Sequence, residues 1–113
     1  MATNQAEKRV RFRDVKPFEV ADSLEELRGP SEGLLTPPVD VHWSGLRTTF
    51  DVSNERQRRR LYQAVLSNGR QEHLSAFLNR DLLLHDWPTL ALDIRIVESW
   101  ARRFPEIEQR RRR

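Results

Sequence analysis

NERQRRRLYQAVLSNGRQEHLSAFLNRDLLLHDWP, residues 54–88, is the longest segment of this chain with helical periodicity. Its large apolar residues fall into two groups, each on one side of a helix: Leu61, Tyr62, Val65 and Leu66, and then Leu74, Phe77 and Leu78. Gly69 lies between the groups and predicts a left-handed stop at the end of the first helix. The segment therefore predicts two or three short helices that pack on one another.

Capping residues set the expected helix ends. Ser53 or Asn54 caps a helix that runs to about residue 68, a second helix covers about residues 71–79, and Asp81 caps a third short turn. Asp93 caps a final helix, which Pro105 ends. The apolar stripe expected on that helix consists of Ile94, Val97, Trp100, Ala101 and Phe104.

Strict alternation of apolar and polar residues predicts strands in the N-terminal half. Residues 9–13 alternate, and so do residues 39–43 and 46–52 on either side of the turn at Ser44 and Gly45. Ser23 and Glu26 have the spacing of a capping box for a short helix, and residues 33–38 form a loop. The predicted fold is α+β, with a small antiparallel sheet (a β-hairpin plus an N-terminal strand) packed against three or four short helices.

A length of 113 residues allows one small domain. Residues 1–8 lack any periodic pattern and are expected to be disordered, residues 9–105 form the domain, and residues 106–113 form a frayed basic C-terminal tail. The chain has no cysteine, no apolar run long enough to cross a bilayer and no signal-peptide pattern at its start. These features predict a cytoplasmic protein.

Positive charge is concentrated in the C-terminal half. Residues 1–53 carry 7 Lys and Arg against 9 Asp and Glu, a net charge of −2, whereas residues 54–113 carry 13 against 8, a net charge of +5. Four of these charges come from Arg110, Arg111, Arg112 and Arg113, without which the net charge of the chain falls from +3 to −1. A basic tail on a nearly neutral body is a weaker sign of nucleic-acid binding than a basic face on a folded element.

Catalytic and metal-binding patterns are missing from the sequence. His73 and His85 are twelve residues apart and belong to no metal-binding motif, and the four glycines form no phosphate-binding loop. Asp81 and His85 could share a proton across one helical turn, but a capping aspartate beside a surface histidine is the commoner arrangement. We therefore expect no enzyme activity, no metal and no cofactor.

Aromatic residues and arginines suggest a surface for a protein partner. Exposed aromatic rings rimmed by arginine are typical of interface centres, and the candidate residues are Trp43, Trp87, Arg56, Arg59 and Arg60. Alternatively, Trp43, Trp87 and Trp100 meet in the core, and the arginines form an ordinary solvated face. For nucleic acid, the candidate phosphate contacts are Arg9, Arg11 and Arg13 on the first strand and Arg110, Arg111, Arg112 and Arg113 in the tail.

Five segments carry a family resemblance: RVRFRDVKPFEVADSLEELRGP, VHWSG, LYQAVLSNG, FLNRDLLLHDWPTL and WARRFPEI. In this order they resemble a family of short, largely uncharacterised proteins of high-GC bacteria, over about residues 10–107. Members of that family are often encoded beside a nucleotidyltransferase-like toxin of the abortive-infection type. The resemblance implies an antitoxin that binds and restrains this toxin. A small nucleic-acid-binding regulator, the autoregulatory half of the same toxin-antitoxin pair, is the alternative.

Overall fold

A computed structural model of the chain describes residues 18–38, 41 and 48–111, and confirms a small α+β fold. Its elements are, in order, η1 (Leu24–Glu26), β1 (Leu34–Leu35), β2 (Phe50–Asp51), α1 (Glu55–Asn68), α2 (Gln71–Phe77), α3 (Arg80–Asp86), η2 (Trp87–Thr89), α4 (Ile94–Arg103) and α5 (Pro105–Arg111). The two strands form an antiparallel sheet in which Leu34 is paired with Asp51 and Leu35 with Phe50. None of the described helices has the length and apolar character needed to span a membrane.

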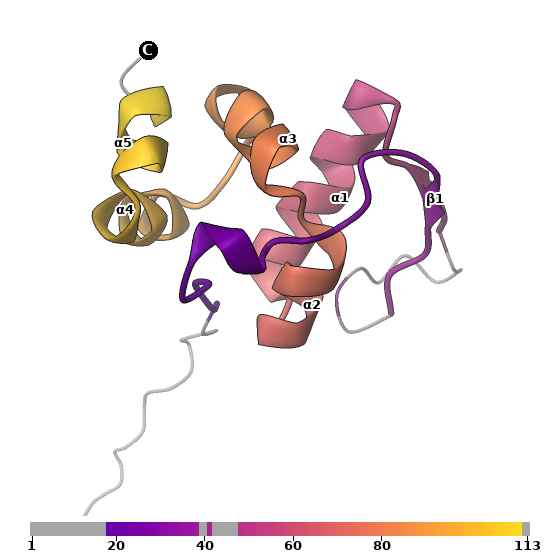
Figure 1. Ribbon diagram of the computed structural model, residues 1–113, viewed down its shortest axis with the longest axis horizontal. Coiled ribbons are helices and arrows are strands. Elements are labelled where there is room, and N and C mark those ends of the chain that lie inside the picture. The colour runs from indigo at the N-terminus through magenta and orange to yellow at the C-terminus, as the bar shows by residue number, and fades with distance from the viewer. Residues whose placement is uncertain (1–17, 39–40, 42–47, 112–113) are drawn as a thin grey trace, which may run out of the picture.

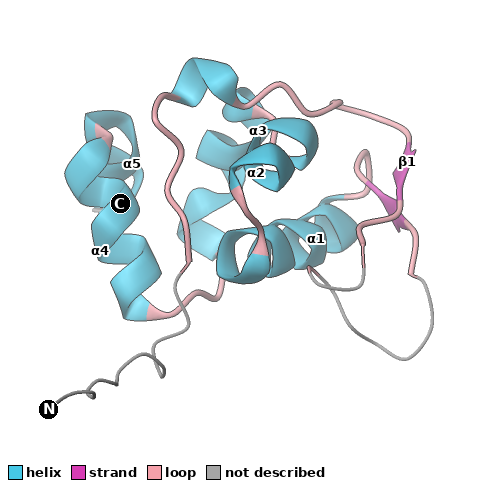
Figure 2. Ribbon diagram, turned by 90° about the horizontal axis from the view of Figure 1, so that it is seen from below, coloured by secondary structure: helices cyan, strands magenta, loops and turns pink. Residues whose placement is uncertain are grey.

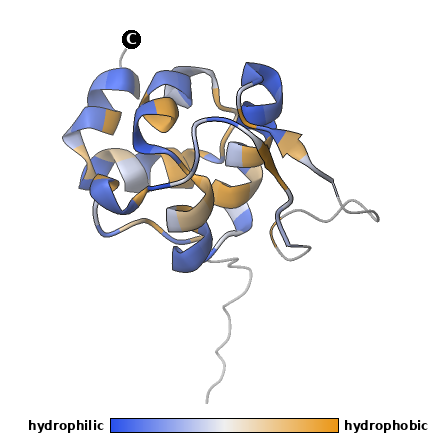
Figure 3. Cartoon of the chain, turned by 45° about the vertical axis from the view of Figure 1, so that its right-hand side comes forward, coloured by the Kyte–Doolittle hydropathy of each residue, from blue (hydrophilic) through white to orange (hydrophobic). Residues whose placement is uncertain are grey.

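The helices form most of the body, with the sheet at one end. Figures 1 and 2 both show α4 and α5 at the end opposite the sheet, with α1, α2 and α3 between them. Apolar segments gather where the helices meet (Figure 3). The largest side chains that are fully buried belong to α1, α4 and β2: Trp100, Tyr62 and Phe50. One hydrophobic core therefore joins the helices to the sheet.

Two of the predicted helix caps are confirmed, and two are wrong. Asn54 accepts a hydrogen bond from the backbone N–H of Gln57 (3.0 Å), and Asp93 accepts one from that of Arg95 (2.8 Å). The cap of α3 is Asn79, which accepts from the N–H of Leu82 (3.1 Å), and the predicted cap Asp81 lies one residue inside the helix. The short helix after Ser23 is a single 3₁₀ turn, and the Ser23 side chain makes no capping hydrogen bond.

Gly69 ends α1 as predicted, but for a different reason. Its φ of −79° and ψ of 157° are extended rather than left-handed. A Cβ at this position would lie 2.7 Å from the carbonyl oxygen of Val65, which is too close for any side chain. The glycine is therefore required by the close approach of the backbone and not by its φ.

The sheet differs in detail from the predicted hairpin. Residues 33–38 were expected to form a loop, yet Leu34–Leu35 form β1, and β2 covers only Phe50–Asp51 of the strand expected at residues 46–52. Most of the other expected hairpin strand, residues 39–43, and the whole N-terminal strand, residues 9–13, lie outside the described residues.

The C-terminal segment is folded where a frayed tail was expected. Pro105 follows the end of α4 but also begins α5, where its missing N–H costs nothing because the first turn of a helix has no acceptor for it. Ile107 of α5 is completely buried. The expected stripe on α4 is also shifted, since Ile94 is 59% exposed while Ile96, one turn before Trp100, is buried.

Candidate partner-binding surfaces

Four arginines near the start of α1 have different environments. Arg58 points into the protein, where its Nε and Nη2 atoms donate to the two carboxylate oxygens of Asp86 (2.7 and 2.9 Å). Its Nη1 atom donates to the carbonyl oxygen of Val52 (3.0 Å). Periodicity explains the inward position, since Arg58 lies one turn before Tyr62 on the buried side of α1. Arg58 therefore joins α1 to α3 and to the end of β2.

The charge of Arg58 is maintained by its surroundings. The hydrogen bond to Asp86 raises the pKa of Arg58 above its ordinary value, although burial acts in the opposite direction. The side chain of Asp86 is 0% exposed and that of Arg58 is 7% exposed. A buried ion pair with two parallel hydrogen bonds results, and it fixes the orientation of α1 relative to α3.

The other three arginines, Arg56, Arg59 and Arg60, lie on the outer side of α1. Arg59 is partly exposed and lies 3.6 Å from the carboxylate of Glu55. Arg56 and Arg60 are exposed, and neither forms an ion pair within the described part of the chain. We call Arg56, Arg59 and Arg60 the α1 arginine face. It presents at least two positive charges, one helical turn apart, to anything that approaches.

A cluster that includes Asp86 of the buried pair has the residue types of a metal site, but the positive charge of Arg58 makes it unsuitable for a cation. Donor atoms of Glu55, His85 and Asp86 lie within 4.8 Å of one another, and the Nε2 atom of His85 is 3.1 Å from a Glu55 carboxylate oxygen. Arg58, however, already donates to both oxygens of Asp86 and places its own positive charge there. A divalent cation would meet repulsion at the deepest of the three ligands, so the cluster joins α1 to α3 through a hydrogen bond between His85 and Glu55 and the ion pair of Arg58 with Asp86. Asp81, one helical turn before His85, contacts Arg80 (3.1 Å).

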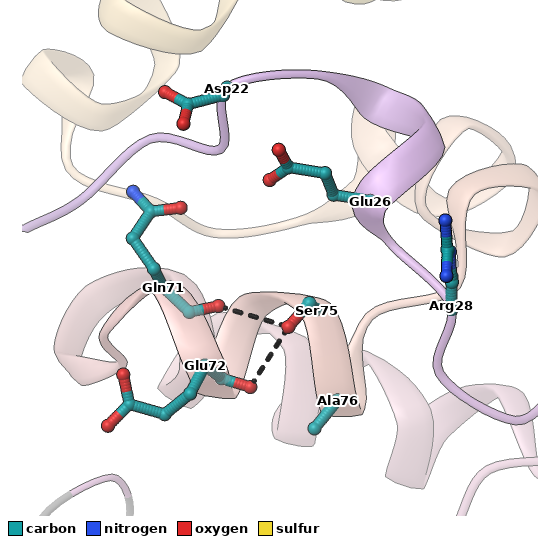
Figure 4. Close-up of a pocket in the computed structure, with 7 residues that line it drawn as sticks. All are labelled: Asp22, Glu26, Arg28, Gln71, Glu72, Ser75 and Ala76. Atoms are coloured by element: carbon teal, nitrogen blue, oxygen red, sulfur yellow. Dashed lines mark hydrogen bonds between the residues drawn. The ribbon is translucent and has the colours of Figure 1, made fainter.

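A groove of about 680 Å³ lies between η1 and α2 (Figure 4). Its charged and polar lining residues are Asp22, Glu26, Arg28, Gln71, Glu72 and Ser75. The α2 wall of the groove includes the short side chains of Ser75 and Ala76, which leave space beside the helix. Three carboxylates against one guanidinium give this acidic groove, as we call it, the opposite sign to the α1 arginine face.

Backbone contacts hold the two walls of the acidic groove together. The N–H of Arg28 donates to the carbonyl oxygen of Ser75 (3.1 Å), and that of Gly29 donates to Leu78 (2.7 Å). A Cβ on Gly29 would lie 2.5 Å from the carbonyl carbon of Phe77, so only glycine allows the two segments to approach this closely. At the other end, the Gln71 side chain donates to the carbonyl oxygen of Val20 (2.8 Å).

The predicted aromatic part of the surface is wrong for Trp87. This side chain is only 4% exposed and packs against Trp100, with a distance of 6.1 Å between ring centroids. Trp100 in turn packs against Phe104, at 5.5 Å. The alternative, that the tryptophans meet in the core, is confirmed for these two. Trp43 lies outside the described residues.

The predicted basic residues are also only partly described. Arg110 is exposed on α5, and Arg111 is the last residue of that helix. The remaining candidates for phosphate contacts lie outside the described residues: Arg9, Arg11, Arg13, Arg112 and Arg113. Sequence reasoning missed the acidic groove altogether, because its two walls are about fifty residues apart in the chain. The pair of small residues at Ser75 and Ala76 was the only local sign of it.

Comparisons of this chain with protein families, with curated proteins and with solved structures find no match. The family resemblance noted in the sequence therefore stays a prediction, and functional inference depends on the two charged surfaces.

Proposed function

We propose that this chain is a non-enzymatic protein-binding module with an antitoxin-like role. It binds the nucleotidyltransferase-like toxin encoded beside it and restrains that toxin by occupying its surface. The resemblance in the sequence supplies the identity of the partner. The α1 arginine face supplies the physical support, because Arg56 and Arg60 are exposed and form no ion pair among the described residues.

Unpaired arginines on a fixed helix are suited to binding an acidic protein surface. An arginine at an interface donates several hydrogen bonds in a planar arrangement that matches a carboxylate. The buried pair of Arg58 and Asp86 fixes α1 before the partner arrives, so less conformational entropy is lost on binding. Charge complementarity of this kind accelerates association and selects the partner.

Capture of the partner from the native host tests this proposal. We expect the tagged chain to retain one stoichiometric partner protein with nucleotidyltransferase activity. Expression of that partner alone should arrest growth, and co-expression of the chain should relieve the arrest. The double variant Arg56→Ala/Arg60→Ala should retain much less of the partner protein. Arg102→Ala/Arg110→Ala is the matched control, because both arginines are exposed, neither forms an ion pair within the described residues, and the net charge changes equally. A stoichiometric partner without such activity would overturn the antitoxin role, and equal loss in the control would overturn the role of the α1 arginine face.

Nucleic-acid binding is the second candidate, and the end of the chain favours it. Arg110 is exposed on α5 and is followed in the sequence by Arg111, Arg112 and Arg113. Affinity for duplex DNA should fall steeply with salt, and it should fall again when these four arginines are deleted. A packed protein complex should survive both changes. Recovery of nucleic acid without a stoichiometric protein would favour this second function.

A further inference from the structure

We propose that the acidic groove binds an arginine-bearing segment of a protein partner. This inference relies on the proposed function only in assigning the segment to a protein. The walls of the groove come from the η1 region and from α2, and both are visible in Figure 4. Its occupant is identified by charge, by the hydrogen-bonding groups that remain free and by the shape of the groove.

The charge of the groove favours a cation. Asp22, Glu26 and Glu72 contribute three negative charges against the single positive charge of Arg28. Asp22 is partly neutralised by Arg103, whose Nη1 atom lies 3.4 Å from its carboxylate. Glu26 and Glu72 form no ion pair in the part of the chain that the structure describes. Two carboxylates on opposite walls are therefore available to an incoming positive group.

The remaining hydrogen-bonding groups favour a donor over an acceptor. The Ser75 hydroxyl lies 3.3 Å from the carbonyl oxygens of Gln71 and Glu72 in its own helix, and it donates to these acceptors (Figure 4). The Nε atom of Arg28 donates to the carbonyl oxygen of Glu25 (3.4 Å). Arg28 keeps its two Nη groups as free donors among the described residues, so the groove offers one guanidinium against the two unpaired carboxylates of Glu26 and Glu72, and its free capacity is mainly carboxylate oxygen. A guanidinium, with five donors and no acceptor, complements such a surface, and a phosphate does not.

The shape of the groove favours a segment of polypeptide over a small molecule. Most of its lining side chains are exposed, including Asp22, Arg28, Gln71, Glu72 and Ala76. A small ligand would keep much of its surface in water, whereas drug-sized ligands usually bury most of theirs. The volume of about 680 Å³ accommodates several side chains of a bound segment. The groove also exists before binding, because the backbone contacts from Arg28 to Ser75 and from Gly29 to Leu78 hold its walls.

Two surfaces of opposite sign would define one orientation of the partner. The partner must present acidic groups to the α1 arginine face and a basic segment to the acidic groove. Reversed docking would place like charges together on both surfaces, which costs affinity. The groove therefore adds specificity that the α1 arginine face alone does not provide.

Selection from a random peptide library on the immobilised full chain tests the inference. We expect enrichment of peptides with at least two arginines, and we expect synthetic copies of them to bind the folded chain in solution. The variant Glu26→Gln/Glu72→Gln should weaken this binding by about tenfold or more, because it removes both charge-assisted acceptors. The control Glu98→Gln/Glu106→Gln removes two exposed carboxylates from α4 and α5 and changes the net charge equally. It should bind the peptides as the wild type does.

Several results would overturn the inference. Equal weakening in the control would mean that the peptides follow the net charge of the protein and not the groove. Enrichment of apolar peptides without arginine would mean that charge does not select the occupant. Enrichment of sequences that match residues 9–13 or 56–60 would identify this chain itself as the occupant. Full capture of the host partner by the Glu26→Gln/Glu72→Gln variant would also exclude the groove while leaving the proposed function intact, so the two ideas fail separately.

Discussion

Arg58 differs from the arginines around it because its charge is buried and shared with Asp86. Two charges without contact with water are stable only as a pair, since removal of one leaves the other without a partner in a medium of low polarity. We expect Arg58→Ala to lower the free energy of unfolding by about 3 to 5 kcal/mol, measured by urea denaturation. Arg95→Ala breaks an exposed pair with Asp93 and should leave the urea midpoint close to that of the wild type.

Replacing both members of the Arg58–Asp86 pair gives a second, independent test of how much the buried charge contributes to stability. Replacement of both partners by apolar residues of similar size, as in Arg58→Met/Asp86→Leu, removes the unpaired charge that makes the single variant unstable. This double variant should recover a large part of the lost stability. If it were as unstable as Arg58→Ala, the loss would come from packing and not from the buried charge.

Tyr62 connects the core to stability at high pH. Burial raises the pKa of Tyr62 to about 12, although the hydrogen bond that its hydroxyl accepts from the N–H of Asn79 acts in the opposite direction. The ordinary tyrosine pKa is about 10, so between about pH 10 and 12 the unfolded chain loses this proton while the folded chain keeps it. The contribution of Tyr62 to stability is therefore fully present below pH 10 and is lost as the pH rises to 12.

The size of this effect is measurable because Tyr62 is the single tyrosine of the chain. A difference of two pKa units corresponds to a loss on the order of 2 to 3 kcal/mol over that pH interval. Ultraviolet absorbance of tyrosinate should show a midpoint near 12 in the folded protein and near 10 in urea. Tyr62→Phe should remove this contribution to the pH dependence of unfolding. A folded-state midpoint near 10 would contradict the burial of the hydroxyl.

Asn79 organises a junction between elements, and its side chain shows why the wrong cap was predicted. The side-chain oxygen Oδ1 of Asn79 accepts from the backbone N–H of Leu82 and caps the start of α3. The side-chain nitrogen Nδ2 donates to the backbone carbonyl oxygen of Gly29 (3.0 Å). Asp81 has a suitable acceptor and lies near the same helix end, so local rules could not separate the two. Of these two residues only the asparagine can accept and donate at once, because an ionised aspartate has acceptors alone, and the second partner of Asn79 is fifty residues away.

Replacement of Asn79 tests this double role. We expect Asn79→Ala to lower the free energy of unfolding by about 1 to 3 kcal/mol, because it removes a cap and leaves a buried acceptor without its donor. Asn79→Asp keeps the cap but loses the donor, so it should fall between the wild type and Asn79→Ala. Asn54→Ala, which removes only a cap, is the comparison for the first effect. Thermal denaturation of the four proteins gives the order, and equal losses for Asn79→Ala and Asn54→Ala would mean that the bond to Gly29 adds nothing.

Local patterns predicted the helical elements well, because helices are held by contacts close in sequence. The periodicity of residues 54–88 and the capping by Asn54 and Asp93 were sufficient to place α1, α2 and the start of α4. The β1 strand was missed because two residues cannot show alternation, and its pairing with Phe50–Asp51 closes a long loop. Gly69 was predicted as a stop, but the close approach of its backbone to Val65 could be seen only after folding.

At the scale of the molecule, the candidate site was only half predictable. The α1 arginine face follows from helical periodicity, and so does the inward position of Arg58, but the partner of Arg58, Asp86, lies in another helix and could not be predicted. Trp87 could not be assigned to surface or core, because its position against Trp100 depends on how α4 packs. The acidic groove joins the η1 region to α2, and no local pattern brings such distant segments together.

The packing of α5 decides whether the C-terminal residues belong to the folded unit. This helix contacts α4, η2 and α3, and Ile107 is its completely buried anchor. The hydrophobic effect and the cavity left behind predict that Ile107→Ala lowers the free energy of unfolding by about 2 to 4 kcal/mol.

Ile94→Ala is the matched control, because the same side chain is 59% exposed at the start of α4 and should cost little when shortened. Hydrogen exchange separates two kinds of loss in Ile107→Ala. If α5 unfolds alone, amide protection should fall first in Pro105–Arg111, whereas a shared core predicts a loss that extends into α4 and η2. We expect the second pattern, because Ile107 belongs to the same buried cluster as Trp87 and Trp100. Equal stability of the two isoleucine variants would mean that α5 is not part of that core.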